Sequence, residues 1–174
     1  MYAVIREDYT KFEILARNRS IQTVHVVITI LNEKAKNYAK QTIGYDKSRK
    51  VLFFRGTAYD AAGKEIKKLK QSEIYDQSAI SGYTLYADGR LKLADLSQQT
   101  YPYTVEYEYE IESNYLYGVP DFELYNDDEI SIERATYIVA YPKSLTPRFK
   151  LTMVPDPIKT TNGDRETVAW DFKN

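Results

Sequence analysis

The sequence predicts an all-β protein: an antiparallel β-sandwich of about ten short strands, with at most one or two short helical turns. Two observations carry this prediction. Apolar and polar residues alternate with a period of two in several short runs, as in strands that have one buried and one solvated face. Turn residues separate these runs, and no long helical pattern alternates with them. The 174 residues suit one domain, so we expect residues 1–174 to form a single β-sandwich domain.

The first strands are predicted in the N-terminal third of the chain. Valine or isoleucine occupies every second position from Val24 to Ile30, and His25 lies on the opposite, more polar face. Residues 51–59 and 64–69 flank the turn-forming residues 60–63 (Asp-Ala-Ala-Gly). These two runs therefore form a predicted hairpin.

The clearest alternation lies in residues 103–111. The apolar positions begin with Tyr103, and the intervening positions carry a threonine and then glutamates. Such a run is a strand with one buried face and one acidic, wet face. Because a shift of one residue changes the face, we expect Tyr107 to be buried and Glu108 to be exposed.

The last third of the chain carries three more predicted strands. In residues 130–140 isoleucine and alanine lie on one face and Ala135, Tyr137 and Val139 on the other, so both faces should be partly covered. The alternation of residues 149–153 and of residues 168–172 predicts a final hairpin that turns at residues 162–164. Its second arm should be an edge strand, with Trp170 facing the core.

Helical patterns are restricted to residues 33–40 and 71–77. Residues 71–86 have no firm period and are predicted to form a long loop that carries a helical turn.

Composition excludes more functions than it indicates. The absence of cysteine excludes disulfides, thiolate metal sites and cysteine nucleophiles. His25 is the only histidine, which excludes multi-histidine zinc sites, and a Ser-His-Asp triad would have to use it. A net charge of −1 gives no basis for nucleic-acid binding. The longest apolar stretch, residues 24–31, is far shorter than the roughly 20 residues that a membrane span needs. We expect no cofactor, no nucleic-acid partner and no membrane insertion.

Three polar features of the sequence are candidate sites. His25 lacks a local nucleophile or orienting carboxylate, so a half-exposed strand residue is the favoured interpretation over a general base. A run of carboxylates could gather oxygen ligands for Ca²⁺, but it lacks the spacing of a calcium loop, and a solvated acidic loop is favoured. A lysine cluster fits the protection of an edge strand better than phosphate binding. The acidic run comprises Asp121, Glu123, Asp127, Asp128 and Glu129, and the lysine cluster comprises Lys64, Lys67, Lys68 and Lys70.

Tyrosine is the unusual component, with 17 residues. Exposed tyrosine clusters suit sugar stacking or protein interfaces, although tyrosines also line sheet faces. Two predicted loops carry the candidate residues for binding a ligand or partner: Tyr75, Tyr83, Tyr86, Tyr115, Tyr117 and Tyr125.

Several stretches together resemble a bacterial family, the domain of unknown function that precedes transglutaminase-like (papain-type) domains in exported proteins. The resembling pieces, in order, are residues 58–66 (AYDAAGKEI), 88–93 (DGRLKL), 105–109 (VEYEY), 139–142 (VAYP) and 169–174 (AWDFKN). Two places depart from the family pattern: Tyr101-Pro102-Tyr103, where a glycine is usual, and Asn126-Asp127-Asp128, where a proline is common.

The resemblance implies a β-sandwich at the N-terminal side of a longer protein whose separate module carries a Cys-His-Asp site. No catalytic residue can be transferred to this chain, so we expect no enzymatic activity from it. The implied function is a non-catalytic accessory or interaction domain that contacts a downstream transglutaminase-like domain. A carbohydrate- or peptide-binding module that uses the loop tyrosines is the alternative, and a stand-alone hydrolase that uses carboxylates is a third. The implied location is periplasmic or secreted, with the signal peptide outside this chain.

Overall fold

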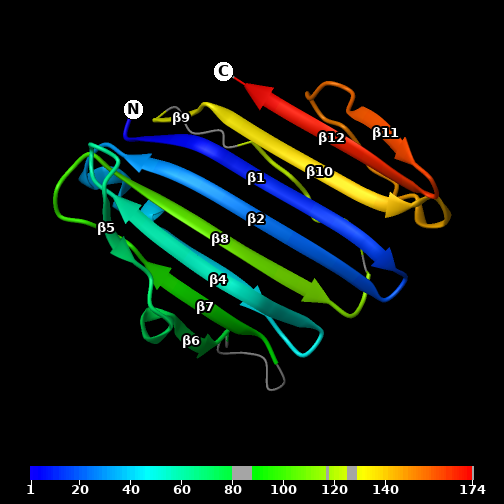
Figure 1. Cartoon of the computed structure of the whole chain (residues 1–174), viewed down its shortest axis with the longest axis horizontal. Coiled ribbons are helices and arrows are strands. Elements are labelled where there is room, and N and C mark those ends of the chain that lie inside the picture. Colours follow the sequence, from blue (N-terminus) through cyan, green and yellow to red (C-terminus); the bar gives the residue numbers. More distant parts are fainter. Residues whose placement is uncertain (80–87, 117, 125–128, 174) are drawn as a thin grey trace.

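The computed structural model describes residues 1–79, 88–116, 118–124 and 129–173 (Figure 1). Within these residues, twelve strands form two sheets. The strands are β1 (Ala3–Ala16), β2 (Arg19–Ile30), β3 (Lys40–Tyr45), β4 (Arg49–Tyr59), β5 (Glu65–Lys68), β6 (Tyr75–Ser78), β7 (Arg90–Asp95), β8 (Tyr103–Ser113), β9 (Ile130–Ile132), β10 (Arg134–Pro142), β11 (Ile158–Asn162) and β12 (Arg165–Lys173). The short 3-10 segments are η1 (Glu33–Ala39), η2 (Gln71–Glu73) and η3 (Lys143–Leu145). The predicted all-β, sandwich-like fold class is confirmed.

The large sheet has the strand order β11-β12-β10-β1-β2-β8-β4-β5, and β9 also pairs with β1. The small sheet has the order β3-β7-β6. Most neighbours are antiparallel, but β1 pairs in parallel with both β9 and β10. The large sheet is therefore mixed rather than purely antiparallel, because the chain returns after β8 to the free side of its first strand.

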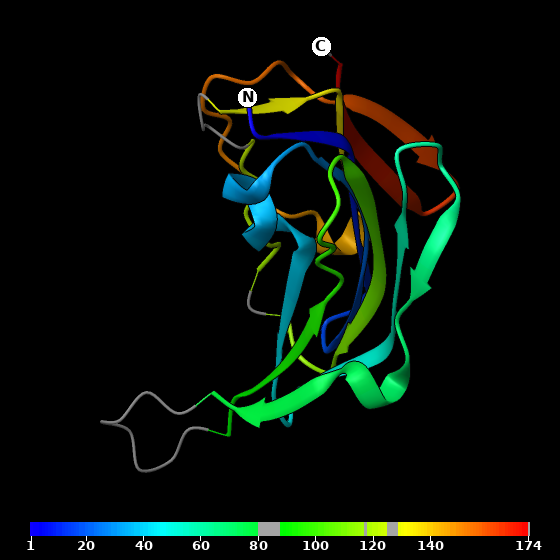
Figure 2. The ribbon, with the colours of Figure 1, turned by 90° about the vertical axis from the view of Figure 1, so that its left-hand side faces the viewer.

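The two sheets enclose the first hydrophobic core. Figure 2 shows η1, β3 and β7 on one side of the large sheet. The Asn32 side chain accepts a hydrogen bond from the Lys34 backbone at the start of η1, which sets the helical turn that directs Ala35 and Ala39 inward. These residues, with Ile43 and Leu96, pack against the inner face of the large sheet: Val26, Ile28, Phe54, Val105, Tyr107 and Ile111.

A second core covers the rest of the same face, where β1, β10 and β12 meet irregular segments instead of strands. Phe122 stacks on Tyr137 with ring centroids 4.8 Å apart, and Phe149 meets Trp170 edge-on at 5.5 Å. The Trp170 indole donates a hydrogen bond to the Pro155 carbonyl at 3.1 Å. The second layer here is formed by apolar side chains of the irregular segments: Leu116, Val119, Phe122, Leu145, Phe149 and Leu151.

The strongest periodic runs lie where they were predicted. Tyr107 is 1% exposed, whereas the Glu108 side chain is 45% exposed. Val24, Val26, Ile28 and Ile30 are buried, and so is Trp170. In the β4–β5 hairpin the Asp60 carboxylate accepts hydrogen bonds from the Ala62 and Lys64 backbones, and Gly63 takes the left-handed conformation that closes the turn.

The predicted first arm of the last hairpin is wrong. Residues 149–153 form no strand, and Met153 is fully exposed with a φ of 57°. Pro155 and Pro157 lack the N–H groups that a ladder needs, so pairing begins only at Ile158 and the first arm is β11. The turn itself is confirmed at Gly163. Consequently β12 is not an edge strand but lies between β10 and β11.

Two further predictions need correction. Residues 71–86 are not one long loop, because β6 follows η2 and pairs with β7. In residues 130–140 the partial covering of both faces is confirmed, because Ala140 is buried as well as Val139. The assignment of Ile132 and Ile138 to one face is wrong: the side that faces the cores changes at Glu133, so Ile132 packs on the first core and Ile138 faces outward. The pairing of β1 with β2 shifts at the neighbouring Ile5/Glu7 position. One irregularity thus crosses two adjacent strands.

Candidate functional site

The outer face of the large sheet, opposite the cores, carries an acidic row along β8. Each glutamate of this row contacts a side chain of a neighbouring strand. Glu106 meets His25, Glu108 approaches Arg55, Glu110 accepts from Thr23, and Glu112 pairs with Arg19. The row arises because β8 alternates strictly and its inner face is committed to the core.

His25 lies at the centre of this face, with its side chain 29% exposed, as the half-exposed interpretation predicted. Its Nε2 atom is 2.8 Å from Glu106 on β8, and its Nδ1 atom is 3.5 Å from Glu7 on β1. The Tyr59 hydroxyl donates to the second oxygen of Glu106 at 2.6 Å. We refer to His25, Glu7, Glu106 and Tyr59 as the His25 cluster.

An open hollow of about 460 Å³ adjoins this cluster. Its lining comes from three adjacent strands and comprises Glu7, Tyr9, Thr23, His25, Glu106 and Glu108. The hydroxyl of Thr23 is 3.1 Å from Glu110 and hydrogen-bonds to it, so it is not positioned as a nucleophile for His25. Across the described ranges, no group of three metal-ligating side chains could hold an ion.

Two opposing effects act on the pKa of the Glu106 carboxyl group. Burial by itself would raise the pKa of Glu106, but hydrogen bonds donated by Tyr59 and His25 outweigh it and hold this pKa below its ordinary value. The same contact raises the pKa of the Tyr59 hydroxyl. The cluster therefore favours an ionised Glu106 that accepts hydrogen bonds from two neighbouring strands.

Replacing Glu106 with glutamine is expected to lower the free energy of unfolding by about 1 kcal/mol or less at pH 7, since the carboxylate is partly solvated. Because the folded-state pKa is lowered, this contribution is present above the unfolded-state value of about 4.3 and is lost as the pH falls through the folded-state value. Urea midpoints of wild type and Glu106→Gln should differ at pH 7, and this difference should shrink as the pH falls below the ordinary glutamate pKa of about 4.3. The control Tyr59→Phe removes one hydrogen-bond donor to Glu106, so in that background the midpoint difference caused by Glu106→Gln should be smaller. A midpoint difference between wild type and Glu106→Gln that stays the same at all pH values would contradict this account.

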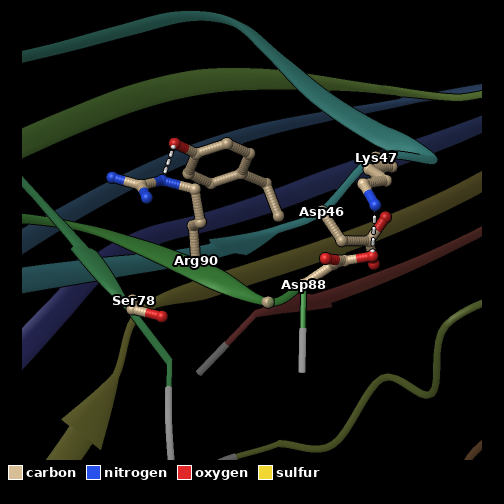
Figure 3. A pocket seen from close by; sticks show the side chains of 7 residues that line it. Asp46, Lys47, Ser78, Asp88 and Arg90 are labelled. Atoms are coloured by element: carbon tan, nitrogen blue, oxygen red, sulfur yellow. Dashed lines mark hydrogen bonds and ion pairs between the residues drawn. The ribbon is translucent and has the colours of Figure 1, made fainter. Parts of the chain in front are cut away.

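A second hollow, of about 410 Å³, lies at the end of the small sheet (Figure 3). Lys47, in the turn before β4, pairs with Asp88 at 2.7 Å, and Arg90 donates to the Tyr45 hydroxyl. Asp46, Ser78 and Gly89 complete the lining. The charged side chains that line this hollow are largely paired with each other or with their neighbours.

Next to this hollow, Asp76 of β6 gathers three partners. Lys92 and Arg90 lie 2.8 Å from its carboxylate oxygens, and the Tyr45 hydroxyl donates at 2.6 Å. The hydrogen bonds from Lys92, then Tyr45 and Arg90, hold the pKa of Asp76 well below its usual range. Contacts of this kind join β3, β6 and β7, and within the described residues they pair the carboxylate of Asp76 with Lys92 and Arg90.

Only two of the six candidate tyrosines can be placed. Tyr75 lies on β6 with 69% of its surface exposed, and Tyr115 is half-buried just after β8. Tyr83, Tyr86, Tyr117 and Tyr125 lie outside the described residues. Close to Tyr115, Leu116, Val119 and Phe122 pack against the second core, so this segment covers the sheet.

The other polar candidates are spread out. Asp127 and Asp128 of the acidic run lie outside the described residues, while Glu129 pairs with the N-terminal ammonium group at 2.8 Å. Lys67 and Lys68 lie on β5, which is the edge of the large sheet, as the edge-protection interpretation predicted. Lys67 contacts Glu73 and the Asp95 carbonyl.

Sequence reasoning missed the surroundings of His25. Alternation places His25 and Glu106 on the polar faces of their strands, but neighbouring carboxylates are found only if β2 is known to lie between β1 and β8. That strand order depends on long-range pairing, for which the sequence carries no local signal.

The geometry defines an all-β domain of sandwich type, and the charged side chains around its two hollows mostly pair with one another within the described residues. The model of a family described as a domain of unknown function with a solved structure (DUF3857) matches residues 16–174. The chain belongs to this family. No curated protein matches the chain in a sequence comparison.

Among solved structures, a protein from Parabacteroides distasonis ATCC 8503, described as a candidate protease, superposes with a TM-score of 0.83 at 12% identity. The alignment covers 99% of this chain and 35% of that one. An M1 zinc metallopeptidase from Deinococcus radiodurans aligns with a TM-score of 0.46 at 7% identity, over 98% of this chain and 39% of that one. The chain thus spans little more than a third of either protein, and the first likeness shows the fold.

No helix in the described part of the chain is long and apolar enough to cross a membrane.

Proposed function

We propose that this domain is a non-catalytic accessory domain that positions or regulates a transglutaminase-like catalytic domain within one exported, periplasmic or secreted protein. The observation that carries the proposal is the fold likeness to about a third of a longer protein described as a candidate protease. The sequence motifs shared with domains that precede transglutaminase-like modules agree with it. The largely self-paired polar groups of both hollows suit a scaffold better than a reaction centre.

The domain by itself is expected to show no transamidase or protease activity, because the chain has no thiol and the Thr23 hydroxyl is bonded to Glu110. The measurement is the incorporation of an amine donor into a glutamine-bearing protein, and peptide hydrolysis, by residues 1–174. Activity that His25→Gln abolishes would contradict this expectation.

The accessory role requires a second measurement on the full-length gene product. Deleting this domain should change the kcat/KM of the catalytic part, and adding residues 1–174 as a separate chain should restore part of that change. Identical kinetics with and without the domain would overturn the accessory role.

Binding of a carbohydrate or a peptide by the tyrosine-bearing segments is the second candidate. The exposed ring of Tyr75 favours it, because an aromatic face that is open to water can stack on a sugar.

A further inference from the structure

The outer edge of β11 is an unpaired strand edge. β11 is the last strand of the large sheet, visible beyond β12 in Figure 1, and all five of its residues are exposed. Asn162 and Arg165 face each other across the two-residue turn at Gly163. In such a hairpin the residues flanking the turn share backbone hydrogen bonds, and bonding alternates from there. The backbone N–H and C=O groups of Lys159 and Thr161 therefore point away from β12, and no backbone group in the described residues bonds to them.

Exposed apolar side chains accompany this edge. Ile158 is 68% exposed on β11, and the segment before it carries Met153, fully exposed, and Phe149, 46% exposed. These three are among the most exposed large apolar residues of the described chain. Phe149 packs against Trp170 on the inner face, so Ile158 is the exposed apolar side chain that lies on the open edge itself.

The same region carries unpaired positive charge. Residues 143–165 contain five lysines and arginines against two aspartates, although the whole chain has a net charge of −1. Four of these cations have no ion-pair partner in the described residues: Lys143, Arg148, Lys150 and Lys159. An incoming acidic segment would meet positive charges that no carboxylate of the described residues pairs with.

We propose that the β11 edge binds an extended acidic peptide segment as an additional, antiparallel strand of the large sheet. Its backbone would bond to Lys159 and Thr161, as in other cases of strand addition to an open edge. Its side chains would alternate, apolar ones beside Ile158 on the outer face and carboxylates beside Lys159 on the inner face. A second copy of this chain fits worse, because two β11 edges would bring the same unpaired cations together. The site is independent of the proposed accessory role and would remain if that role were disproved.

The test uses the 174-residue chain and the acetylated, amidated peptide Thr-Val-Glu-Val-Glu-Val-Thr. Binding should shift the amide NMR signals of Lys159 and Thr161 and change the emission of Trp170, whose indole bonds to Pro155 near the start of β11. A peptide with lysine in place of glutamate should bind more weakly than the acidic peptide. The difference in affinity between the two peptides should shrink at high salt, because salt screens exposed charges. A peptide N-methylated at alternate backbone positions keeps its charge but cannot form the ladder, so it should not bind.

Two variants separate charge from backbone pairing. Lys159→Glu should weaken the binding of the acidic peptide about two- to fivefold and strengthen the binding of the lysine peptide, as expected for one exposed ion pair. Thr161→Pro removes an outward N–H and should abolish binding of either peptide, while the matched control Thr161→Val should bind like wild type. Failure of the acidic peptide to bind, equal binding of its N-methylated form, or dimerisation through β11 at high protein concentration would each overturn the proposal.

Discussion

A chain that ends at Asp164 is expected to lose cooperative folding. The deletion removes β12, which pairs with β10 from Arg134 to Pro142 and with all of β11. It also removes Val168 and Trp170 from the second core, where they are 1% and 8% exposed. Losing an internal strand and two buried side chains costs several kcal/mol, comparable to the whole stability of many domains.

Thermal unfolding followed by circular dichroism, together with size-exclusion chromatography, measures this effect. In the intact chain Trp170 should show blue-shifted emission. The control Trp170→Phe keeps the strand and a ring but leaves the Pro155 carbonyl without its donor, and should cost about 1–3 kcal/mol while remaining folded. A monomeric truncated chain with a cooperative transition would show that β12 is dispensable.

Tyr107→Ala is expected to destabilise the domain by about 3–5 kcal/mol, as other large-to-small changes of buried aromatic residues do. The Tyr107 ring lies 5.9 Å from Phe54 between ring centroids, and its hydroxyl donates to the Ala39 carbonyl at 2.7 Å. Gly56 lies against this ring so closely that a Cβ there would come within 2.8 Å of it. The substitution therefore opens a cavity where two sheets and η1 meet.

Urea midpoints of three variants separate the contributions. Tyr107→Phe keeps the ring and loses the hydrogen bond to Ala39, so it should cost about 1–3 kcal/mol. Glu108→Ala, one position further and on the solvated face, should cost under about 0.5 kcal/mol. A larger effect at Glu108 than at Tyr107 would mean that the faces of β8 are reversed.

Local patterns predicted the fold class well because the strongest strands each bury one face. Residues 24–30 of β2 and residues 103–111 of β8 carry apolar residues at every second position, and Asp60 and Gly163 belong to turns whose chemistry is local. The pattern misled where apolar residues pack without pairing: Phe149 and Leu151 alternate like a strand but cover the second core from an irregular segment. Alternating apolar residues therefore need not pair in a ladder, and the third residue of this run, Met153, is fully exposed.

The surroundings of His25 and the parallel pairing of β1 could not be predicted, for one physical reason. Both depend on which strands become neighbours, and β1 and β10 are separated by more than a hundred residues. Strand order depends on how all the strands pack around both cores, and no single segment of the sequence determines it.

The pairing of β1 also governs the order in which the domain can form during synthesis. β2 can pair with β1 as soon as both strands have left the ribosome. The other edge of β1 pairs with β9 and β10, which are synthesised much later. Until then the nascent chain presents one open edge of β1, with Phe12 and Ile14 uncovered. Long-range parallel closure of this kind slows folding and prolongs the exposure of apolar surface to wrong partners, so the yield of folded domain should depend on chaperone supply as well as on its final stability.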